Sequence, residues 1–255
     1  MVICPRGLNQ VLKDGSHIVN WTVARDLLRP ESFSFLATVF VMLPAAAFLS
    51  HLRIESGLPL PPKSRRYRLG ICFQILVAGC AIQFARAHEI TLFPAVTPEG
   101  LQLSYGVLFV AAGAIGLRRG WPRLTEKRRR RALLLLPENT RELGYWVLIS
   151  LLAGFGEELA YRGALFYFLR EVTGSAPLAI GLCVLAFGVA HVAQGPRAIL
   201  GTGILALFFH LLVFVTGTLY VAMLAHAGYD LVIGVIALQY ARREAPAHLQ
   251  PVGAS

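Results

Sequence analysis

The chain has 255 residues, of which 56% are hydrophobic and only 15% are charged, and its formal net charge is +10. Soluble domains carry about 25% charged residues, so this composition excludes an ordinary soluble domain and indicates a membrane protein. The positive charge does not indicate a nucleic-acid surface, because the basic residues cluster in short loops between apolar segments. We therefore expect a lipid bilayer around the chain and no nucleic-acid partner.

The amino-terminal stretch, residues 1–32, lacks the apolar centre of a cleavable signal peptide. It mixes apolar side chains such as Trp21 with charged ones such as Arg25, a pattern typical of an amphipathic helix at a membrane surface. The sequence therefore predicts three parts. They are an interfacial amphipathic segment at 1–32, a multi-pass membrane domain at 33–243 and a short carboxyl-terminal tail at 244–255.

Seven apolar runs follow one another through the predicted membrane domain. They lie at residues 33–52, 69–85, 99–117, 143–169, 177–193, 198–216 and 218–240. A helix needs about 20 apolar residues to cross a bilayer, so the predicted fold class is all-α, a polytopic membrane helical bundle with about seven transmembrane helices. The stretch that contains run 143–169 is too long for a straight span, so that helix must tilt or project.

Two basic loops predict the orientation in the membrane. Residues 53–68 include five basic side chains and residues 118–131 include eight. Two predicted spans separate these loops, so both lie on one face, and the positive-inside rule makes that face cytoplasmic. Arginine outnumbers lysine by 21 to 3, which we interpret as bacterial coding. We expect an integral protein of a bacterial inner membrane whose amino terminus lies outside.

The first polar motif is "EELAYR", which places two adjacent carboxylates inside an apolar run. Arg162 follows Glu158 by four residues, the favoured spacing for a helical ion pair. Glu157 points about 100° away from its neighbour on a helix and has no such partner. The asymmetry predicts a structural role for Glu158 and a chemical role for Glu157.

Two further motifs carry histidines. "FGVAH" puts Phe187 and His191 on one helix face, and "HAGYD" does the same for His226 and Asp230. An ionisable residue within a membrane indicates a functional site, although a satisfied hydrogen bond between helices is the alternative for each motif alone. His210 has no polar partner on its own helix, and we assign it to that structural alternative.

The predicted depths of three side chains agree. Counted at ~1.5 Å of helical rise per residue from nearby turns, Glu157, His191 and His226 fall about 14–21 Å into the membrane. This common layer lies somewhat closer to the basic face of a hydrocarbon core about 30 Å thick. We therefore expect the three side chains to form one site.

Three kinds of chemistry use a buried carboxylate beside two histidines. Glutamate can activate a water that attacks an amide, with the second polar pair stabilising the oxyanion. Histidine and carboxylate ligands can instead hold zinc, and a transporter can use them for proton or ion coupling. The sequence lacks an H-E-x-x-H zinc motif and a G-x-S-x-G serine elbow. It also lacks the second motif of presenilin-type aspartyl proteases.

The ordered motifs E-E-x-x-x-R, F-x-x-x-H and H-x-x-x-N/D resemble those of the CPBP family. This family includes the type II CAAX prenyl endopeptidases and bacterial relatives that act in bacteriocin processing and immunity. The resemblance covers about residues 143–240, the protease-like core. It implies a glutamic-type intramembrane endopeptidase without a cofactor, although zinc remains an alternative.

The resemblance also implies a role for each motif residue. Glu157 would be the general base, and His191 would help to hold the water. His226 and Asp230 would line the oxyanion site. The remaining members of the motifs, Glu158, Arg162 and Phe187, would support the structure.

Asp230 departs from the prenyl proteases, which carry asparagine at this motif position. An ionised aspartate cannot donate to an oxyanion, so Asp230 must either be protonated or orient and charge His226 for that purpose.

The expected substrate is a membrane-anchored or membrane-embedded peptide, such as the carboxyl-terminal sorting tail of a surface protein or a bacteriocin leader. The alternative from another class is a non-catalytic scaffold or immunity protein that uses the polar residues as a binding network. A transporter ranks third, because the sequence contains no internal repeat.

Overall fold

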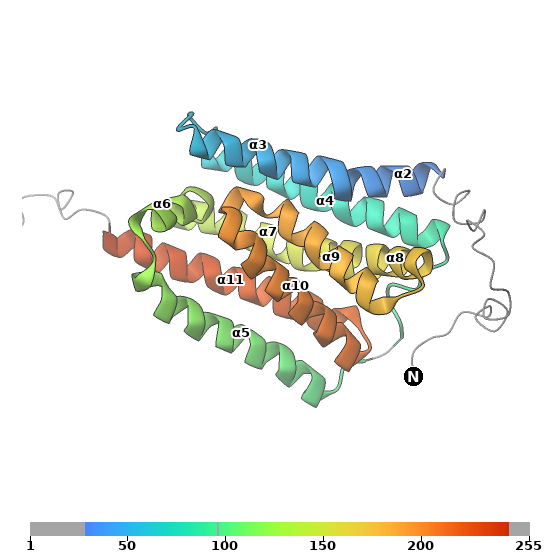
Figure 1. The fold of residues 1–255 in the computed structure, drawn as a ribbon. Coiled ribbons are helices and arrows are strands. Elements are labelled where there is room, and N and C mark those ends of the chain that lie inside the picture. Colours follow the sequence, from blue (N-terminus) through green and yellow to red (C-terminus); the bar gives the residue numbers. More distant parts are fainter. Residues whose placement is uncertain (1–28, 96, 245–255) are drawn as a thin grey trace, which may run out of the picture.

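The computed structural model describes residues 29–95 and 97–244, and every regular element in these ranges is a helix (Figure 1). The helices are α2 (Pro30–Ala37), η1 (Thr38–Met42), α3 (Leu43–Glu55), α4 (Lys63–Ala87), α5 (Gly100–Gly120), η2 (Trp121–Arg123), α6 (Glu126–Leu135), α7 (Thr140–Glu157), η3 (Glu158–Leu165), α8 (Phe166–Thr173), α9 (Ala176–Ala190), η4 (Val192–Gln194), α10 (Pro196–Thr216) and α11 (Leu219–Glu244). The predicted all-α class is confirmed.

Six helices in the described part of the chain are long and apolar enough to cross a membrane. They are Pro30–Glu55, Lys63–Ala87, Gly100–Arg123, Thr140–Thr173, Pro196–Thr216 and Leu219–Arg243. The seventh predicted span corresponds to α9, a shorter apolar helix. Its 15 residues extend roughly 22 Å at 1.5 Å per residue, which is less than the hydrocarbon core. The polytopic bundle is confirmed, as six full-length helices and one short one.

The long run around residues 143–169 forms one continuous rod of 34 residues, made of α7, η3 and α8. Asn139 begins this rod, because its side chain accepts a hydrogen bond from the backbone N–H of Glu142 at 2.9 Å, as an N-cap does. Gly174 ends it with a left-handed φ of 65°, a conformation that glycine adopts without steric cost. The rod is the central element of the bundle.

Three helices make the main contacts with this central rod. α11 and α4 pack along α7, η3 also contacts α4, and α8 packs against α9 (Figure 1). The core is concentrated at η3, where Leu159, Ala160 and Leu165 are fully buried. The motif "EELAYR" therefore enters a helical segment, η3, in which all eight residues are buried.

A glycine permits the closest of these contacts. A Cβ atom at Gly154 would lie 2.7 Å from the backbone oxygen of Met223 and 2.8 Å from the Cβ of Ala227. Real Cβ atoms essentially never approach so closely, so only glycine lets α7 and α11 meet here. The close approach brings Glu157, one turn after Gly154, beside His226.

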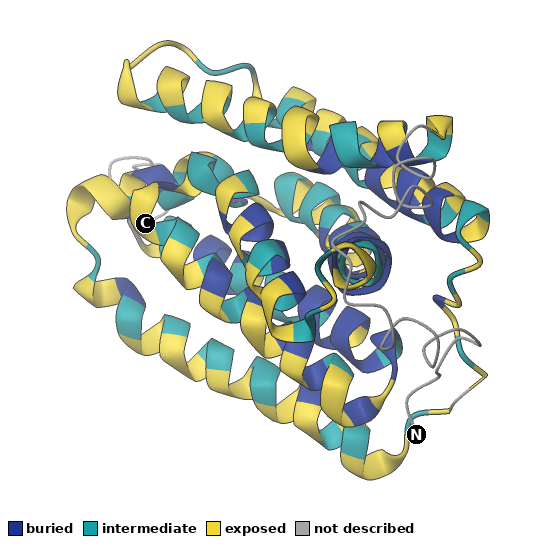
Figure 2. Cartoon of the chain, turned by 45° about the vertical axis from the view of Figure 1, so that its right-hand side comes forward, coloured by how far each residue is buried: buried dark blue, intermediate teal, exposed yellow. Residues whose placement is uncertain are grey.

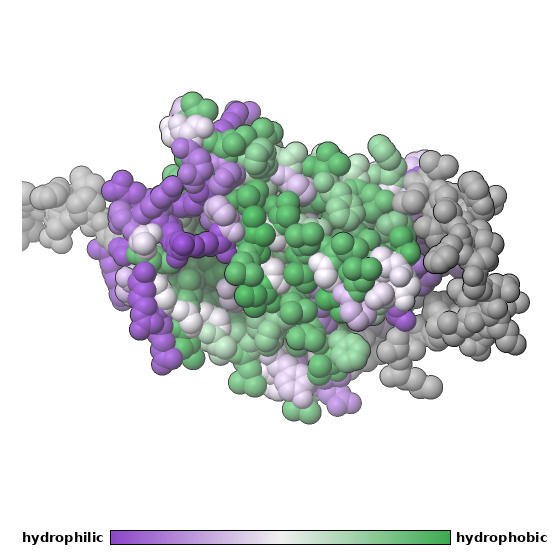
Figure 3. Space-filling model, viewed as in Figure 1, coloured by the Kyte–Doolittle hydropathy of each residue, from purple (hydrophilic) through white to green (hydrophobic). Residues whose placement is uncertain are grey.

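Large apolar side chains cover much of the outer surface, and burial is concentrated on the inner faces of the helices (Figure 2). Hydrophilic residues gather at one end of the molecule, where α6 lies (Figure 3). An apolar belt with a polar end is what a bilayer requires. The chain is an integral membrane protein.

The two basic loops meet at this polar end, which we call the basic end. Lys127 forms an ion pair with Glu55 at 3.1 Å. Lys63 pairs with Glu138 at 2.7 Å and donates to the backbone oxygen of Leu136 at 3.0 Å. The sequence predicted that these loops share one face.

Two predicted segments fall largely outside the described residues. The interfacial helix at 1–32 is described only from residue 29, where α2 begins at Pro30. Of the carboxyl-terminal tail at 244–255, only the last residue of α11 is described. Both remain predictions.

Candidate active site

The two adjacent carboxylates lie at the change from α7 to the π-helix η3. Glu157 is the last residue of α7 and Glu158 is the first of η3. Wide π-helical turns often occur at functional sites. The side chain of Glu157 is 12% exposed and that of Glu158 is 0% exposed, so the two carboxylates point into different surroundings.

Glu158 lies on the side of the rod that is enclosed by other helices of the protein. Its Oε1 is 3.2 Å from the Arg162 guanidinium, the ion pair that the spacing predicted. The same oxygen accepts a hydrogen bond from Nδ1–H of His226 at 2.7 Å. Arg162 also donates to the backbone oxygen of Ala206 at 3.1 Å, and its guanidinium lies 4.6 Å from the centre of the Phe187 ring. Glu158 therefore connects the ion pair to a histidine of another helix.

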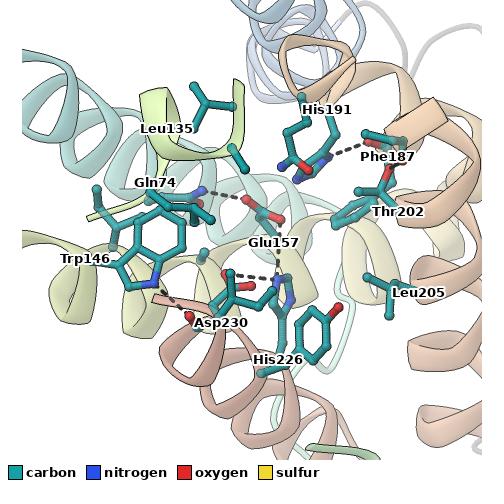
Figure 4. Close-up of a pocket in the computed structure, with 18 of the residues that line it drawn as sticks. Gln74, Leu135, Trp146, Glu157, Phe187, His191, Thr202, Leu205, His226 and Asp230 are labelled. Carbon is teal, nitrogen blue, oxygen red and sulfur yellow. Dashed lines mark hydrogen bonds and ion pairs between the residues drawn. The ribbon is translucent and has the colours of Figure 1, made fainter. Parts of the chain in front are cut away.

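Glu157 lies on the open side, facing a cavity (Figure 4). Its Oε1 accepts a hydrogen bond from the amide of Gln74 at 2.6 Å. Its Oε2 is 3.8 Å from Nε2 of His226, and the same histidine nitrogen is 3.7 Å from Oδ2 of Asp230. His226 thus lies between the two carboxylates. Its Nδ1 contacts Glu158 inside the protein, and its Nε2 faces Glu157 and Asp230 at the cavity.

His191 occupies the carboxyl-terminal cap of α9. Its Nδ1 lies 2.8 Å from the backbone oxygen of Phe187, and its ring stacks on the Phe187 ring with 4.5 Å between centres. A carbonyl oxygen only accepts, so Nδ1 carries the proton and donates. In the neutral ring Nε2 is then an acceptor, able to hold a water.

All four side chains predicted to be catalytic line one cavity of about 370 Å³: Glu157, His191, His226 and Asp230. Helix α6 forms its wall at the basic end through Arg131, Ala132 and Leu135. A cavity of this volume lies within the range of ligand-binding pockets. The site is therefore bounded by membrane helices on its sides and by α6 at the basic end.

Arg131 fastens this wall to the rest of the site. It is buried, and its Nε and one terminal nitrogen both donate to the backbone oxygen of Ala193, at 3.1 and 3.0 Å. Its guanidinium also pairs with Glu55 and donates to Nδ1 of His51 at 2.6 Å. Ala193 lies in η4, the turn that follows His191. We call this arrangement the Arg131 clasp.

The sequence motifs did not include three residues that complete the site. Gln74 comes from α4, Arg131 from α6, and Trp146 from α7, where its indole N–H donates to the backbone oxygen of Asp230 at 2.7 Å. Gln74 had a signal, because an amide inside an apolar run commonly bonds to another membrane helix. Nothing in the sequence distinguished Arg131 from the other arginines of its loop.

A metal site is the second chemistry that the polar side chains left open. Within residues 29–95 and 97–244, no three His, Cys, Asp or Glu side chains are grouped in a way that could hold a metal ion. Nδ1 of His226 is engaged by Glu158, and Nδ1 of His191 by a backbone oxygen.

Comparison with protein families matches the core of the chain. Residues 139–232 match the family described as type II CAAX prenyl endopeptidase Rce1-like. The predicted resemblance is confirmed. This Rce1-like segment (residues 139–232) contains Glu157, Glu158, Arg162 and every histidine motif. The family is one of membrane proteases, so the match supports an intramembrane endopeptidase of the CAAX type in general.

Neither the curated proteins nor the solved structures gave a match to this chain. The Rce1-like segment includes α7, η3, α8, α9, η4, α10 and most of α11. Gln74 and Arg131 lie outside it, although both contact its site.

Proposed function

We propose that this protein is an intramembrane endopeptidase that hydrolyses a peptide bond with a water activated by Glu157. The observation that carries the proposal is the convergence of Glu157, His191, His226 and Asp230 on one cavity. Glu157 comes from α7, His191 from the end of α9, and the other two from α11. Side chains on three helices meet at a cavity wall within an apolar bundle, where unpaired polar groups are costly.

Glu157 and His191 hold the attacking water. Oε1 of Glu157 is taken by Gln74, which leaves Oε2 as the basic oxygen. Nε2 of His191 accepts a second hydrogen bond from the water, because Nδ1–H is committed to the backbone. The water oxygen bonds to the substrate's carbonyl carbon, and its proton moves to Oε2 of Glu157. When the C–N bond breaks, Glu157 returns this proton to the departing amine.

His226 stabilises the oxyanion that forms during the attack. Nδ1–H is committed to Glu158, so Nε2 can donate only when the ring carries a proton on both nitrogens. Glu158 on one side and Asp230 on the other, 3.7 Å from Nε2, surround the ring with negative charge. Asp230 therefore acts by orienting and charging His226, one of the two roles open to an aspartate at this position. No resident cofactor enters this scheme.

The substrate is a peptide anchored in or to the same membrane. The cavity lies among membrane helices and is bounded at the basic end by α6. This position supports a substrate chain that enters the cavity from the lipid. We propose that the basic end is cytoplasmic, following the positive-inside rule. Sorting tails of surface proteins and peptide leaders are the two substrate types to examine first.

The test is a comparison of membrane-protein termini in host cells that carry either the wild type or Glu157→Gln at equal abundance. Loss of a general base costs about 10²–10⁴-fold in rate, so termini produced by the enzyme should disappear in the variant. Glu171→Gln is the matched control, because Glu171 lies on the same rod but is exposed near its far end.

A terminus near a membrane segment that appears with the wild type and Glu171→Gln, but not with Glu157→Gln, supports the proposal and identifies the substrate. Identical termini in all three strains contradict it and favour a scaffold or immunity role. Metal analysis of the active purified protein tests the zinc alternative, since a stoichiometric metal required for cleavage would contradict direct activation by Glu157.

A further inference from the structure

Helix α4 lies outside the Rce1-like segment, yet one of its side chains contacts the proposed general base. The amide nitrogen of Gln74 is 2.6 Å from Oε1 of Glu157 (Figure 4). A carboxylate only accepts hydrogen bonds, so the nitrogen of the amide must face it. We infer that Gln74 is a positioning residue that selects which oxygen of Glu157 acts as the base, an inference that rests on the proposed function.

The backbone holds Gln74 close to the base. A Cβ atom at Gly156 would lie 3.1 Å from the backbone oxygen of Gln74 and 3.4 Å from the Cβ of Ala78. The absence of a side chain at Gly156 therefore allows α4 to lie directly against the turn that presents Glu157. Because the backbones of α4 and α7 are this close, the side chain of Gln74 is long enough to reach the carboxylate of Glu157.

The two oxygens of Glu157 are left in different states. Oε1 holds the Gln74 hydrogen bond. Oε2 is buried and has no hydrogen-bond partner among the described residues, while Nε2 of His226 stands 3.8 Å away. Leaving a buried hydrogen-bond acceptor without a partner is destabilising, and a bound water supplies the missing donor. Gln74 thus directs the free oxygen to the position where the water is needed.

The same hydrogen bond keeps Glu157 apart from His226. At 3.8 Å the two groups attract each other without a direct hydrogen bond. Without Gln74, the carboxylate is free to rotate and close that distance. A direct Glu157–His226 contact would occupy both the base and the oxyanion donor, so the water and the oxyanion would each lose a partner.

The test uses Gln74→Leu, which removes the donor, and Gln83→Leu as the matched control. Gln83 lies on the same helix and is exposed. The assay measures the cleavage rate of the purified protein on the peptide that the terminus comparison identifies. A hydrogen bond to a charged group is equivalent to about 10- to 100-fold in rate. We expect a fall of this size in kcat for Gln74→Leu with KM nearly unchanged, and wild-type values for Gln83→Leu.

A second readout needs no substrate. The infrared carboxylate stretching band of Glu157 is assigned by its loss in Glu157→Gln. Removing the Gln74 donor should shift this band, whereas Gln83→Leu should leave it in place. A merely structural role for Gln74 would not move a band that belongs to one carboxylate. If Gln74→Leu reduces abundance, Gln74→Met, with an unbranched side chain of similar length, takes its place in both measurements.

The outcomes separate the two proposals. Unchanged cleavage by Glu157→Gln overturns the proposed function itself. If Glu157→Gln is inactive while Gln74→Leu keeps the wild-type kcat and the wild-type band, only the positioning inference is wrong. A lower kcat with a shifted band, seen in Gln74→Leu and absent from Gln83→Leu, supports it.

Discussion

Two glutamate–arginine pairs in this protein have the same helical spacing and opposite surroundings. Glu158 and Arg162 in η3 are 3.2 Å apart with fully buried side chains. Glu126 and Arg130 in α6 are 2.6 Å apart, and their side chains are 64% and 78% exposed. Sequence spacing and distance would rank the exposed pair as equal or better, so neither quantity measures what a pair contributes.

The difference lies in what surrounds each charge. Arg162 has a backbone oxygen and an aromatic face beside it, and Glu158 has His226 as a second partner. If one member is removed, the other stays in a low-dielectric interior without compensation. Water can replace either member of the exposed pair, so its net contribution is small. We therefore expect burial, rather than spacing or distance, to decide how much the pair in η3 contributes to stability.

The largest effect is expected from Arg162→Ala. It leaves the carboxylate of Glu158 buried and unpaired, a loss of about 3–5 kcal/mol. We expect the abundance of the protein in membranes to fall severely, measured by immunoblot at equal transcript level. Normal accumulation of Arg162→Ala would show that the ion pair does not stabilise the fold.

A double variant sharpens this comparison. Glu158→Gln/Arg162→Met removes both charges of the pair together, so neither is left buried without its partner. Such paired replacements can be close to neutral for stability. We expect abundance to recover relative to Arg162→Ala, while cleavage stays low because His226 has lost the carboxylate that anchors Nδ1. Recovery of both properties would limit the buried pair to a folding role.

An intermediate effect is expected from Arg131→Ala, which opens the Arg131 clasp. The substitution removes two hydrogen bonds to Ala193 and the contacts with Glu55 and His51. Because Ala193 lies two residues after His191, the histidine should lose its fixed orientation. We expect cleavage to fall by about 10- to 100-fold, the equivalent of one charge-assisted hydrogen bond, with a smaller loss of abundance. Equal losses of cleavage and abundance would contradict this role.

The smallest effect is expected from Arg130→Ala, the neighbour of Arg131 and its control. The hydrogen bond from Arg130 lowers the pKa of the exposed Glu126 carboxyl. Removing it should return this pKa toward its ordinary value without measurable change in abundance or cleavage, because solvent screens the exposed charge. A large loss would mean that α6 depends on surface pairing and that the comparison between the two pairs is wrong.

The sequence predicted interactions within one helix and the common depth of the three motifs, but it missed the contacts that α4 and α6 make with the site. The Glu158–Arg162 pair and the neighbouring positions of Phe187 and His191 follow from helical periodicity, which is a local property. The contacts of Gln74 with Glu157 and of Arg131 with Ala193 depend on which helices are neighbours. That choice is made by shape, for example by Gly154 and Gly156, whose missing side chains allow close approach. No periodic pattern marks such glycines in advance.

The number of spans illustrates the same limit. Hydropathy located all seven apolar segments, but it could not distinguish the helices that are long enough to cross a bilayer from one that is shorter. α9 begins at Ala176 and ends at Ala190, immediately before His191. Its termination depends on the irregular turn η4 and on Gly195, whose φ of 111° suits glycine.

The shortness of α9 has a consequence for solvent. Irregular backbone at the depth of lipid tails is tolerated only where protein buries it or where it lines a hydrated cavity. η4 lies against α6 and the Arg131 clasp, and His191 faces the cavity. From the early end of the helix we therefore expect the aqueous phase to reach inward beneath α6, so that the proposed hydrolysis would take place where the hydrophobic barrier is locally thinned.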